Sequence, residues 1–175
     1  MAHPAQKTFL CDIRSTFPHL FIGKKVLDIG SLDINGNNRF LFDRCQYTGI
    51  DLGPGKNVDI VCKGHLFKSE DLFDIVISTE CLEHDKFYIE TFKNMIQLTN
   101  SGGLTIFTCA SHERPEHGTS RTSPGASPIS HKIFNDYYRN INAIDITREV
   151  DLEKIYKIYC LKFMDNDLYF YGIKR

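Results

Sequence analysis

The apolar positions of this chain fall into two patterns, short strand-like runs and longer stretches with helical spacing. Five short runs are bounded by glycine, proline or polar residues, which is typical of buried strands. They are residues 25–29, 46–51, 58–61, 73–78 and 104–109. In the second pattern apolar residues recur at intervals of three and four, which predicts helices over residues 7–17 and 86–98. Strands that alternate with helices in this way predict a parallel sheet covered by helices.

The connections and the tail complete this prediction. Residues 62–72 leave room for at most one helical turn between the third and fourth strands. Residues 100–103 are expected to end the preceding helix by supplying left-handed backbone positions. A last helix is predicted over residues 131–140, and residues 156–163 and 168–173 read as two β-rich runs around a turn. The residues of the last helix expected to pack inward are Ile133, Phe134, Tyr137 and Tyr138.

Two features in the first half of the chain point to a ligand. The first strand ends at Gly30 and the apolar pattern resumes after Gly36, so we expect a strand, a turn and then a helix. In an open parallel sheet such a turn lies at the carboxyl end of the strand, where small side chains let a nucleotide-like ligand approach the backbone. Asp51 ends the second strand, where a carboxylate can accept hydrogen bonds from both hydroxyls of a ribose. Each feature alone also fits an ordinary turn or strand cap, but together they favour a nucleoside-containing ligand.

At these positions the sequence resembles the class I S-adenosylmethionine-dependent methyltransferases. Four blocks occur in the order of that family: residues 26–30, 47–51, 73–84 and 101–107. The departure is at residues 31–33, which stand where commoner members carry Cys-Gly-x-Gly, so the chain looks like a variant branch. The resemblance implies a Rossmann-like α/β fold, a doubly wound and mostly parallel sheet with a C-terminal antiparallel hairpin, in three αβα layers.

The resemblance also implies where S-adenosylmethionine binds. Asp51 would hold the ribose, Gly30 would lie beneath the methionine part, and Asp28 would orient the turn or reach the donor's amino group. Thr79 and Glu80 would flank the donor. The full set of expected donor contacts is Asp28, Gly30, Ser31, Asp51, Leu52, Thr79 and Glu80. Residues 62–65 offer no carboxylate for the adenine amino group, so the adenine is expected to be contacted by backbone groups or by a residue elsewhere in the chain.

Residues 110–130 are polar and rich in His, Arg, Pro, Gly, Ser and Thr. Such a segment cannot bury itself, and it is either a surface insertion or a lid that closes over the acceptor. Two histidines are candidate general bases, because an unperturbed imidazole accepts a proton near neutral pH. His117 lies in the middle of this loop beside Glu116, which is expected to hold it or to raise its pKa. His84 follows the fourth strand, where it lines the site or caps the next helix.

Composition and net charge bear on the number of domains, the partners and the location of the protein. The chain has 175 residues, of which 42% are hydrophobic and 25% are charged, which fits a single domain over residues 1–175. A formal net charge of -1 gives no support for nucleic acid or an anionic membrane as the main partner. The aromatic residues of the tail are therefore interpreted as core packing rather than as a base-stacking platform. No apolar stretch is long enough to span a bilayer and no secretory leader is visible, so we expect a cytoplasmic protein.

The six cysteines form no C-x-x-C pair, so neither a zinc knuckle nor a disulfide framework is predicted. We expect them to be reduced and mostly buried, and we predict no metal site.

The function that these features favour is methyl transfer from S-adenosylmethionine to a small-molecule acceptor. The alternative is a methyltransferase-fold protein that binds the donor, has lost turnover and acts as a binding or partner protein. A nicotinamide enzyme fits less well, since residues 30–36 lack G-x-G-x-x-G spacing. The Asn-Pro-Pro-Tyr or Asp-Pro-Pro-Tyr run of amino-methylating DNA enzymes is also missing.

Overall fold

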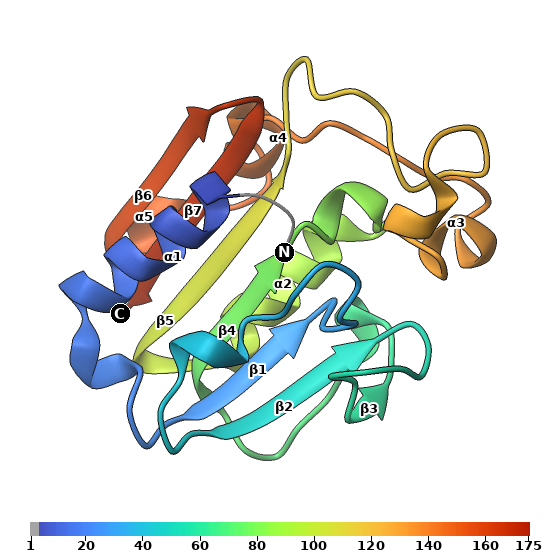
Figure 1. Cartoon of the computed structure of the whole chain (residues 1–175). Helices are drawn as coiled ribbons and strands as arrows, with labels where there is room; N and C mark the ends of the chain where they lie inside the picture. Colours follow the sequence, from blue (N-terminus) through green and yellow to red (C-terminus); the bar gives the residue numbers. More distant parts are fainter. Residues whose placement is uncertain (1–3) are drawn as a thin grey trace.

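A computed structural model describes residues 4–175, and its centre is one seven-stranded sheet (Figure 1). The strands are β1 (Lys25–Ile29), β2 (Gln46–Asp51), β3 (Ile60–Val61), β4 (Phe73–Thr79), β5 (Thr99–Ala110), β6 (Tyr156–Met164) and β7 (Asp167–Lys174). Their order across the sheet is β3-β2-β1-β4-β5-β7-β6. The pairings among β1 to β5 are parallel, and β7 runs antiparallel to both β5 and β6. The predicted Rossmann-like sheet with a C-terminal antiparallel hairpin is therefore confirmed.

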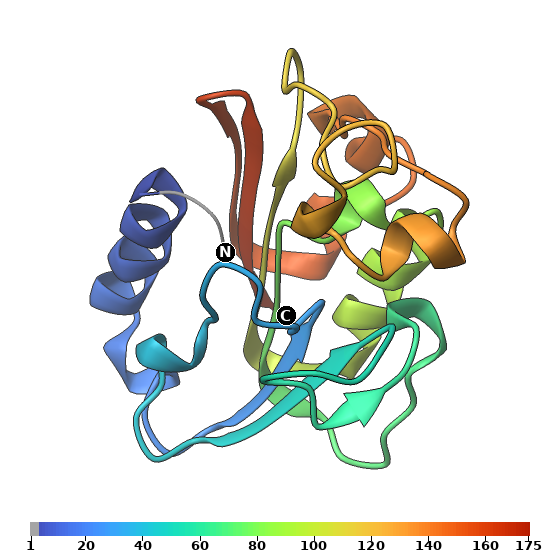
Figure 2. The same cartoon turned by 45° about the vertical axis from the view of Figure 1, so that its right-hand side comes forward.

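Helices cover both faces of this sheet, which gives the expected three layers (Figure 2). The helices are α1 (Pro4–Thr16), α2 (Tyr88–Leu98), α3 (Ser130–Ile133), α4 (Ala143–Thr147) and α5 (Leu152–Ile155). Single 3-10 turns are η1 (Pro18–Leu20), η2 (Arg39–Leu41), η3 (Gly64–Leu66), η4 (Leu82–His84) and η5 (Pro124–Ala126). Helix α1 lies on one face, and α2 to α5 lie on the other side of the sheet. The predicted helices at residues 7–17 and 86–98 are thus α1 and α2.

Alternate residues of the central strands supply the two halves of the core. In β4, Ile75 and Ile77 pack with the apolar stripe of α1, whereas Val76 packs with α2. Side chains of a strand point alternately to opposite faces, so a strand buried on both faces reads as a continuous apolar run. The connection between β3 and β4 is the single turn η3, as the short spacing predicts.

The helix expected after Gly36 does not form, and that prediction is wrong. Only the 3-10 turn η2 lies between Gly36 and β2. The Asp33 side chain accepts hydrogen bonds from the backbone N–H of Gly36 at 2.8 Å and from Asn37 Nδ2 at 2.9 Å. A short polar side chain that bonds nearby backbone groups offers the chain an alternative to a helix.

The predicted helix at residues 131–140 is also wrong beyond its first turn, because α3 ends at Ile133. Asn135 and Asp136 adopt left-handed backbone angles, with φ of 53° and 58°, which an α-helix cannot contain. The Asp136 carboxylate accepts a hydrogen bond from the backbone N–H of Ser120 at 2.7 Å, which ties this bend to the loop after β5. Of the four residues expected to pack inward, Phe134 is buried, Tyr137 and Tyr138 are half-buried, and Ile133 is exposed.

The glycine pair after α2 has a different role from the one predicted. Helix α2 ends at Leu98 and β5 begins at once with Thr99, so Gly102 does not cap the helix. Gly102 does adopt a left-handed φ of 76°, but it does so inside the extended segment.

The tail forms the expected hairpin, and its turn follows from its sequence. Asp165 and Asn166 both adopt left-handed angles, with φ of 52° and 66°, as a two-residue type I′ turn requires. Phe170 in β7 stacks on Phe107 in β5 with ring centroids 5.0 Å apart, and both side chains are fully buried. The interpretation of the tail aromatics as core packing is confirmed for this pair.

All six cysteines are free, as expected, but the expectation that most are buried is wrong. Only Cys109 is buried, Cys11 is exposed on α1, and the other four are half-buried. Cys45, Cys62 and Cys81 lie outside the helices and strands, and Cys160 lies in the edge strand β6, so none of these four is enclosed by the core. Within residues 4–175, no helix has the length and apolar character needed to cross a membrane.

Candidate functional site

A cleft opens at the carboxyl ends of β1, β2 and β4, the edge at which open α/β sheets bind ligands. Its floor comes from the segments that follow these strands, including Gly30, Asp51, Leu52 and Glu80. Residues 126–130 and Phe134, which follow β5 in the chain, form the opposite wall. The predicted ligand-binding edge of the sheet therefore carries a cleft, and the loop after β5 reaches it.

Gly30 is the residue that lets the chain turn beneath this cleft. It has a φ of +80°, and a Cβ built on it would lie 2.5 Å from both Cβ and Sγ of Cys81. The backbone N–H groups of Gly30 and Ser31 both donate to the carbonyl oxygen of Ile50, at 2.9 and 3.0 Å. A left-handed turn in contact with the β4 loop leaves room only for glycine.

Asp51 presents a carboxylate to the cleft in a defined orientation. Its Oδ2 accepts a hydrogen bond from the backbone N–H of Leu32 at 3.0 Å, and its Oδ1 accepts one from Leu52 at 2.7 Å. Burial raises the pKa of Asp51, while the backbone N–H groups of Leu32, Leu52 and Gly53 oppose that shift. Since a carboxylate oxygen accepts more than one hydrogen bond, both oxygens can still bind hydroxyl donors from a ligand.

Three of the predicted donor contacts lie outside the cleft lining. Asp28 is buried, where it accepts hydrogen bonds from the Tyr47 hydroxyl and from Asn38 Nδ2. The same amide nitrogen donates to Thr79 Oγ1 at 3.1 Å, so Thr79 belongs to the Asp28 network. Burial raises the pKa of Asp28 to about 6, although these hydrogen bonds oppose the shift. Ser31 is likewise turned away, with its hydroxyl donating to the carbonyl oxygen of Asn57 at 3.0 Å.

Glu80 lines the cleft at the end of β4. Its backbone has a left-handed φ of 50°, which is uncommon for a residue with a long side chain. This conformation changes the direction of the chain at the end of β4. Its Oε1 accepts a hydrogen bond from Thr108 Oγ1 at 3.0 Å. Burial and the neighbouring Asp167 raise the pKa of Glu80.

The two candidate bases lie side by side, although only His84 lines the cleft. Their ring centroids are 5.0 Å apart with an interplanar angle of 87°. Burial and the proximity of His117 lower the pKa of His84 to about 3, and burial also lowers the pKa of His117. Both imidazoles are therefore neutral at neutral pH.

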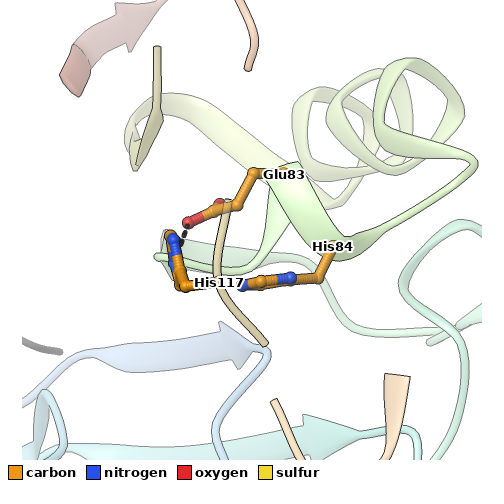
Figure 3. A group of neighbouring side chains, drawn as sticks. All are labelled: Glu83, His84 and His117. Carbon is orange, nitrogen blue, oxygen red and sulfur yellow. Dashed lines mark ion pairs between the residues drawn. The ribbon is translucent and has the colours of Figure 1, made fainter. Parts of the chain in front are cut away.

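The predicted role of Glu116 is wrong, because it neither holds His117 nor raises its pKa. Its Oε1 accepts hydrogen bonds from Thr119 Oγ1 at 2.7 Å and from Arg121 Nε at 3.0 Å. The acid that approaches His117 is instead Glu83, whose Oε1 lies 3.9 Å from His117 Nε2 (Figure 3). Sequence reasoning missed Glu83, although the adjacent residue His84 marks the position.

The loop after β5 divides into two parts with different positions. Residues 126–130 line the cleft, and the side chain of Ile129 occupies the space beside Gly53, where a built Cβ would lie 2.7 Å from Ile129 Cδ1. Residues 112–121 do not line it. Residues 126–130 are called the roof segment below. Its apolar member Ile129 is the signal in the sequence that could have located it.

The matching family model is that of a methyltransferase domain, and it covers residues 1–117. The chain belongs to this methyltransferase domain family. The resemblance to class I S-adenosylmethionine-dependent methyltransferases is thereby confirmed. No curated protein sequence was found to match the chain.

Solved structures with the same fold are numerous, and three illustrate it. The 1,6-didemethyltoxoflavin-N1-methyltransferase of Burkholderia thailandensis has a TM-score of 0.61 and 12% identity, with 99% of this chain and 91% of that chain covered. The N-methyltransferase NodS of Bradyrhizobium japonicum WM9 has a TM-score of 0.56 and 15% identity, covering 95% and 97%. Phosphoethanolamine N-methyltransferase 2 of Haemonchus contortus has a TM-score of 0.59 and 20% identity, covering 90% of this chain but 38% of its own. At these identities the likeness shows the fold.

Proposed function

We propose that this chain transfers the methyl group of S-adenosylmethionine to a small-molecule acceptor bound in the cleft. The observation that carries the proposal is the pairing of Asp51 with Gly30 at adjacent strand ends. Asp51 offers a carboxylate fixed by two backbone N–H groups, and Gly30 offers a turn without a side chain in the same cleft. This pair matches the ribose and the tail of a nucleoside-containing donor.

The donor is assigned along the cleft from these two residues. Asp51 accepts hydrogen bonds from the ribose hydroxyls, Leu52 packs near the adenine, and the methionine part passes over Gly30 toward Glu80. Cys62 and Gly64 line the end of the cleft beyond β3, so backbone groups are available to the adenine edge there. Asp28, Ser31 and Thr79 act behind the floor by holding the turn that carries Gly30.

For methyl transfer, the main contribution of the protein is to align the acceptor atom with the sulfonium methyl group. The acceptor atom attacks the sulfonium methyl in line, and a cleft that holds both reactants supplies orientation and excludes water. Neither histidine is assigned as a free proton acceptor. A pKa of about 3 makes His84 a weak base at neutral pH, and His117 reaches the cleft only through His84.

A small acceptor fits the surroundings of the site. The roof segment lines the cleft together with the segments that follow β1, β2 and β4, so the proposed acceptor site is bounded on more than one side. The formal net charge of -1 offers no general attraction for nucleic acid. The structural neighbour from Burkholderia thailandensis holds 1,6-didemethyltoxoflavin and S-adenosylhomocysteine, which supports a small acceptor here by analogy of fold.

The test has two stages on the full chain. Calorimetry with S-adenosylmethionine is expected to give one site per chain, and a panel of small amines, alcohols and thiols is then screened for production of S-adenosylhomocysteine. Turnover with a panel member supports the proposal. Binding of the donor without turnover on any acceptor favours the alternative of an inactive donor-binding protein, and absence of donor binding overturns both.

A further inference from the structure

Three side chains converge beside the cleft, and one of them, His84, lines it. Glu83 and His84 come from η4, and His117 comes from the loop after β5 (Figure 3). Figure 3 shows the side chains of Glu83 and His84 both pointing toward His117. One ligand atom from each of the three lies within 4.8 Å of the other two. Among residues 4–175 this is the group of acidic, histidine and cysteine side chains whose spacing fits a shared metal ion.

Of the three side chains, Glu83 has a buried carboxylate group that a bound cation would stabilise. Its side chain is fully buried, and neither carboxylate oxygen has a hydrogen-bond partner within the part of the chain that the structure describes. His117 Nε2 at 3.9 Å is too distant for a hydrogen bond. Burial, together with the nearby Glu80 and Asp167, raises the pKa of Glu83, while the neighbouring backbone N–H groups of Glu83 and Ala110 oppose that shift without meeting hydrogen-bond geometry. A buried carboxylate is normally paired, hydrogen-bonded or bound to a metal.

The surroundings of His117 and His84 fix the two imidazole rings in different ways. The Nδ1 atom of His117 lies 3.1 Å from the carbonyl oxygen of Pro115, so this nitrogen carries the proton and Nε2 keeps its lone pair. A ring N–H bonded to a carbonyl is the usual outer contact of a metal-binding histidine. The Nδ1 atom of His84 is buried and has no hydrogen-bond partner among the described residues. Gly118, with φ of +67°, backs the His84 ring so closely that a built Cβ would lie 2.7 Å from Cε1.

We propose that Glu83, His84 and His117 bind one divalent transition-metal ion, with Zn²⁺ as the best match. Two imidazole nitrogens and one carboxylate form a donor set typical of zinc sites that keep a fourth position open. Mg²⁺ and Ca²⁺ fit less well, since both prefer oxygen ligands throughout.

The three ligand atoms, which lie within 4.8 Å of one another, must move closer together to share one ion. With metal–ligand distances of about 2.0–2.2 Å, the ligand atoms of a tetrahedral site lie roughly 3.3–3.5 Å apart. The observed separation of 3.9 Å between Glu83 Oε1 and His117 Nε2 is close to this value. His117 lies on a loop and its side chain is 23% exposed, so it can make the remaining movement.

The position of the ion would matter for the reaction, a step that rests on the proposed function. His84 lines the cleft, so an ion bound to it would lie beside the cleft wall. A cation at that place can hold an acceptor oxygen and lower the pKa of its hydroxyl group. The hydroxyl proton would then pass to solvent water before the oxygen attacks the sulfonium methyl.

The experiment measures metal binding apart from catalysis. The full chain is titrated with Zn²⁺ against a chromophoric chelator, and with Co²⁺ while the visible absorption is recorded. One ion per chain with a micromolar or tighter Kd is expected, and both His117→Ala and Glu83→Gln should weaken it by at least about tenfold, as loss of metal-site contacts does. The matched control is His112→Ala, which removes a 70% exposed histidine of the same loop and should bind as the parent does.

Two results would overturn the proposal: parental Zn²⁺ affinity in His117→Ala and Glu83→Gln, or no binding at micromolar concentrations in the parent. Binding of S-adenosylmethionine is measured on every variant as the test of folding. Metal binding without donor binding would leave the metal site standing and remove the proposed function, so the two failures are distinguishable.

Discussion

Gly30 and Cys81 meet at the floor of the cleft so closely that a Cβ on Gly30 would lie 2.5 Å from the Sγ of Cys81. The contact joins the turn after β1 to the turn after β4, the two segments between which the donor is proposed to lie. Any side chain at position 30 must displace the backbone of one of these turns. The shape of the donor site therefore depends on this contact.

The substitution Gly30→Ala is expected to destabilise the protein and to weaken donor binding. Left-handed backbone at a non-glycine residue costs about 1–2 kcal/mol by itself, and the clash with Cys81 adds to it. The matched control is Gly23→Ala, since Gly23 has a similar φ of +66° but nothing within 4 Å of a built Cβ. Chemical denaturation of both variants measures the difference, and equal losses of stability would show that the clash is relieved at no cost.

Asp51→Ala is expected to weaken S-adenosylmethionine binding by at least about tenfold. Hydrogen bonds to a charged group contribute roughly 1.5–3 kcal/mol each, and the ribose would lose such bonds. Calorimetry checks this, with Asp71→Ala as control because Asp71 is an exposed carboxylate paired with Lys25 away from the cleft. Parental affinity in Asp51→Ala would mean that Asp51 only caps its strand.

Replacement of Asp28 by Asn is expected to change how stability depends on pH. The folded-state pKa of Asp28 is raised from 3.8 to about 6, so the folded state binds the proton more tightly than the unfolded chain does. The contribution of Asp28 to the free energy of unfolding is therefore complete below pH 3.8. It is lost as the pH rises through 6, and the loss amounts to about 3 kcal/mol. Between pH 4 and 6.5 the parent should lose stability relative to Asp28→Asn.

The control for that experiment is Asp33→Asn, because the pKa of Asp33 is shifted the other way. Its hydrogen bonds with Lys56 and Asn37 lower the pKa to about 2, so its contribution is lost only as the pH falls below 3.8. Between pH 4 and 6.5 the difference between Asp33→Asn and the parent should be constant. A flat profile for Asp28→Asn as well would show that Asp28 stays ionised in the folded state.

The roof segment is expected to become more protected when ligands bind. Donor and acceptor analogues together should slow hydrogen exchange at residues 126–130, since these line the cleft, and less so at residues 112–121. The variant Ile129→Ser removes the contact at Gly53 and should weaken donor binding several-fold, whereas Ile133→Ser alters a 43% exposed side chain and serves as control. Unchanged exchange with saturating ligands would mean that the segment is a fixed wall.

Short-range features of the sequence were enough to predict the sheet and, to within one residue, the carboxyl ends of β1 to β5, whereas β3 and β5 begin at other residues than expected. A buried strand needs only a few adjacent apolar residues, and the turn at Asp165 and Asn166 needs only two residues that tolerate left-handed backbone. Gly30 and Asp51 were placed at one edge for the same reason, since parallel strands end together. Strands, the hairpin turn and the strand ends all depend on residues that are close together in the sequence.

The tertiary structure alone decided which polar side chains meet. Asp33 and Asp136 bond to nearby or distant backbone groups and so replace two predicted helices with turns, which helical periodicity cannot reveal. Asp28 carries the expected motif but is turned to Tyr47 behind the cleft floor. Glu83 and His117 belong to segments on either side of α2 and β5, and their approach depends on how the loop after β5 folds back over the sheet. Contacts of this kind arise from packing between distant segments, and local sequence does not encode their geometry.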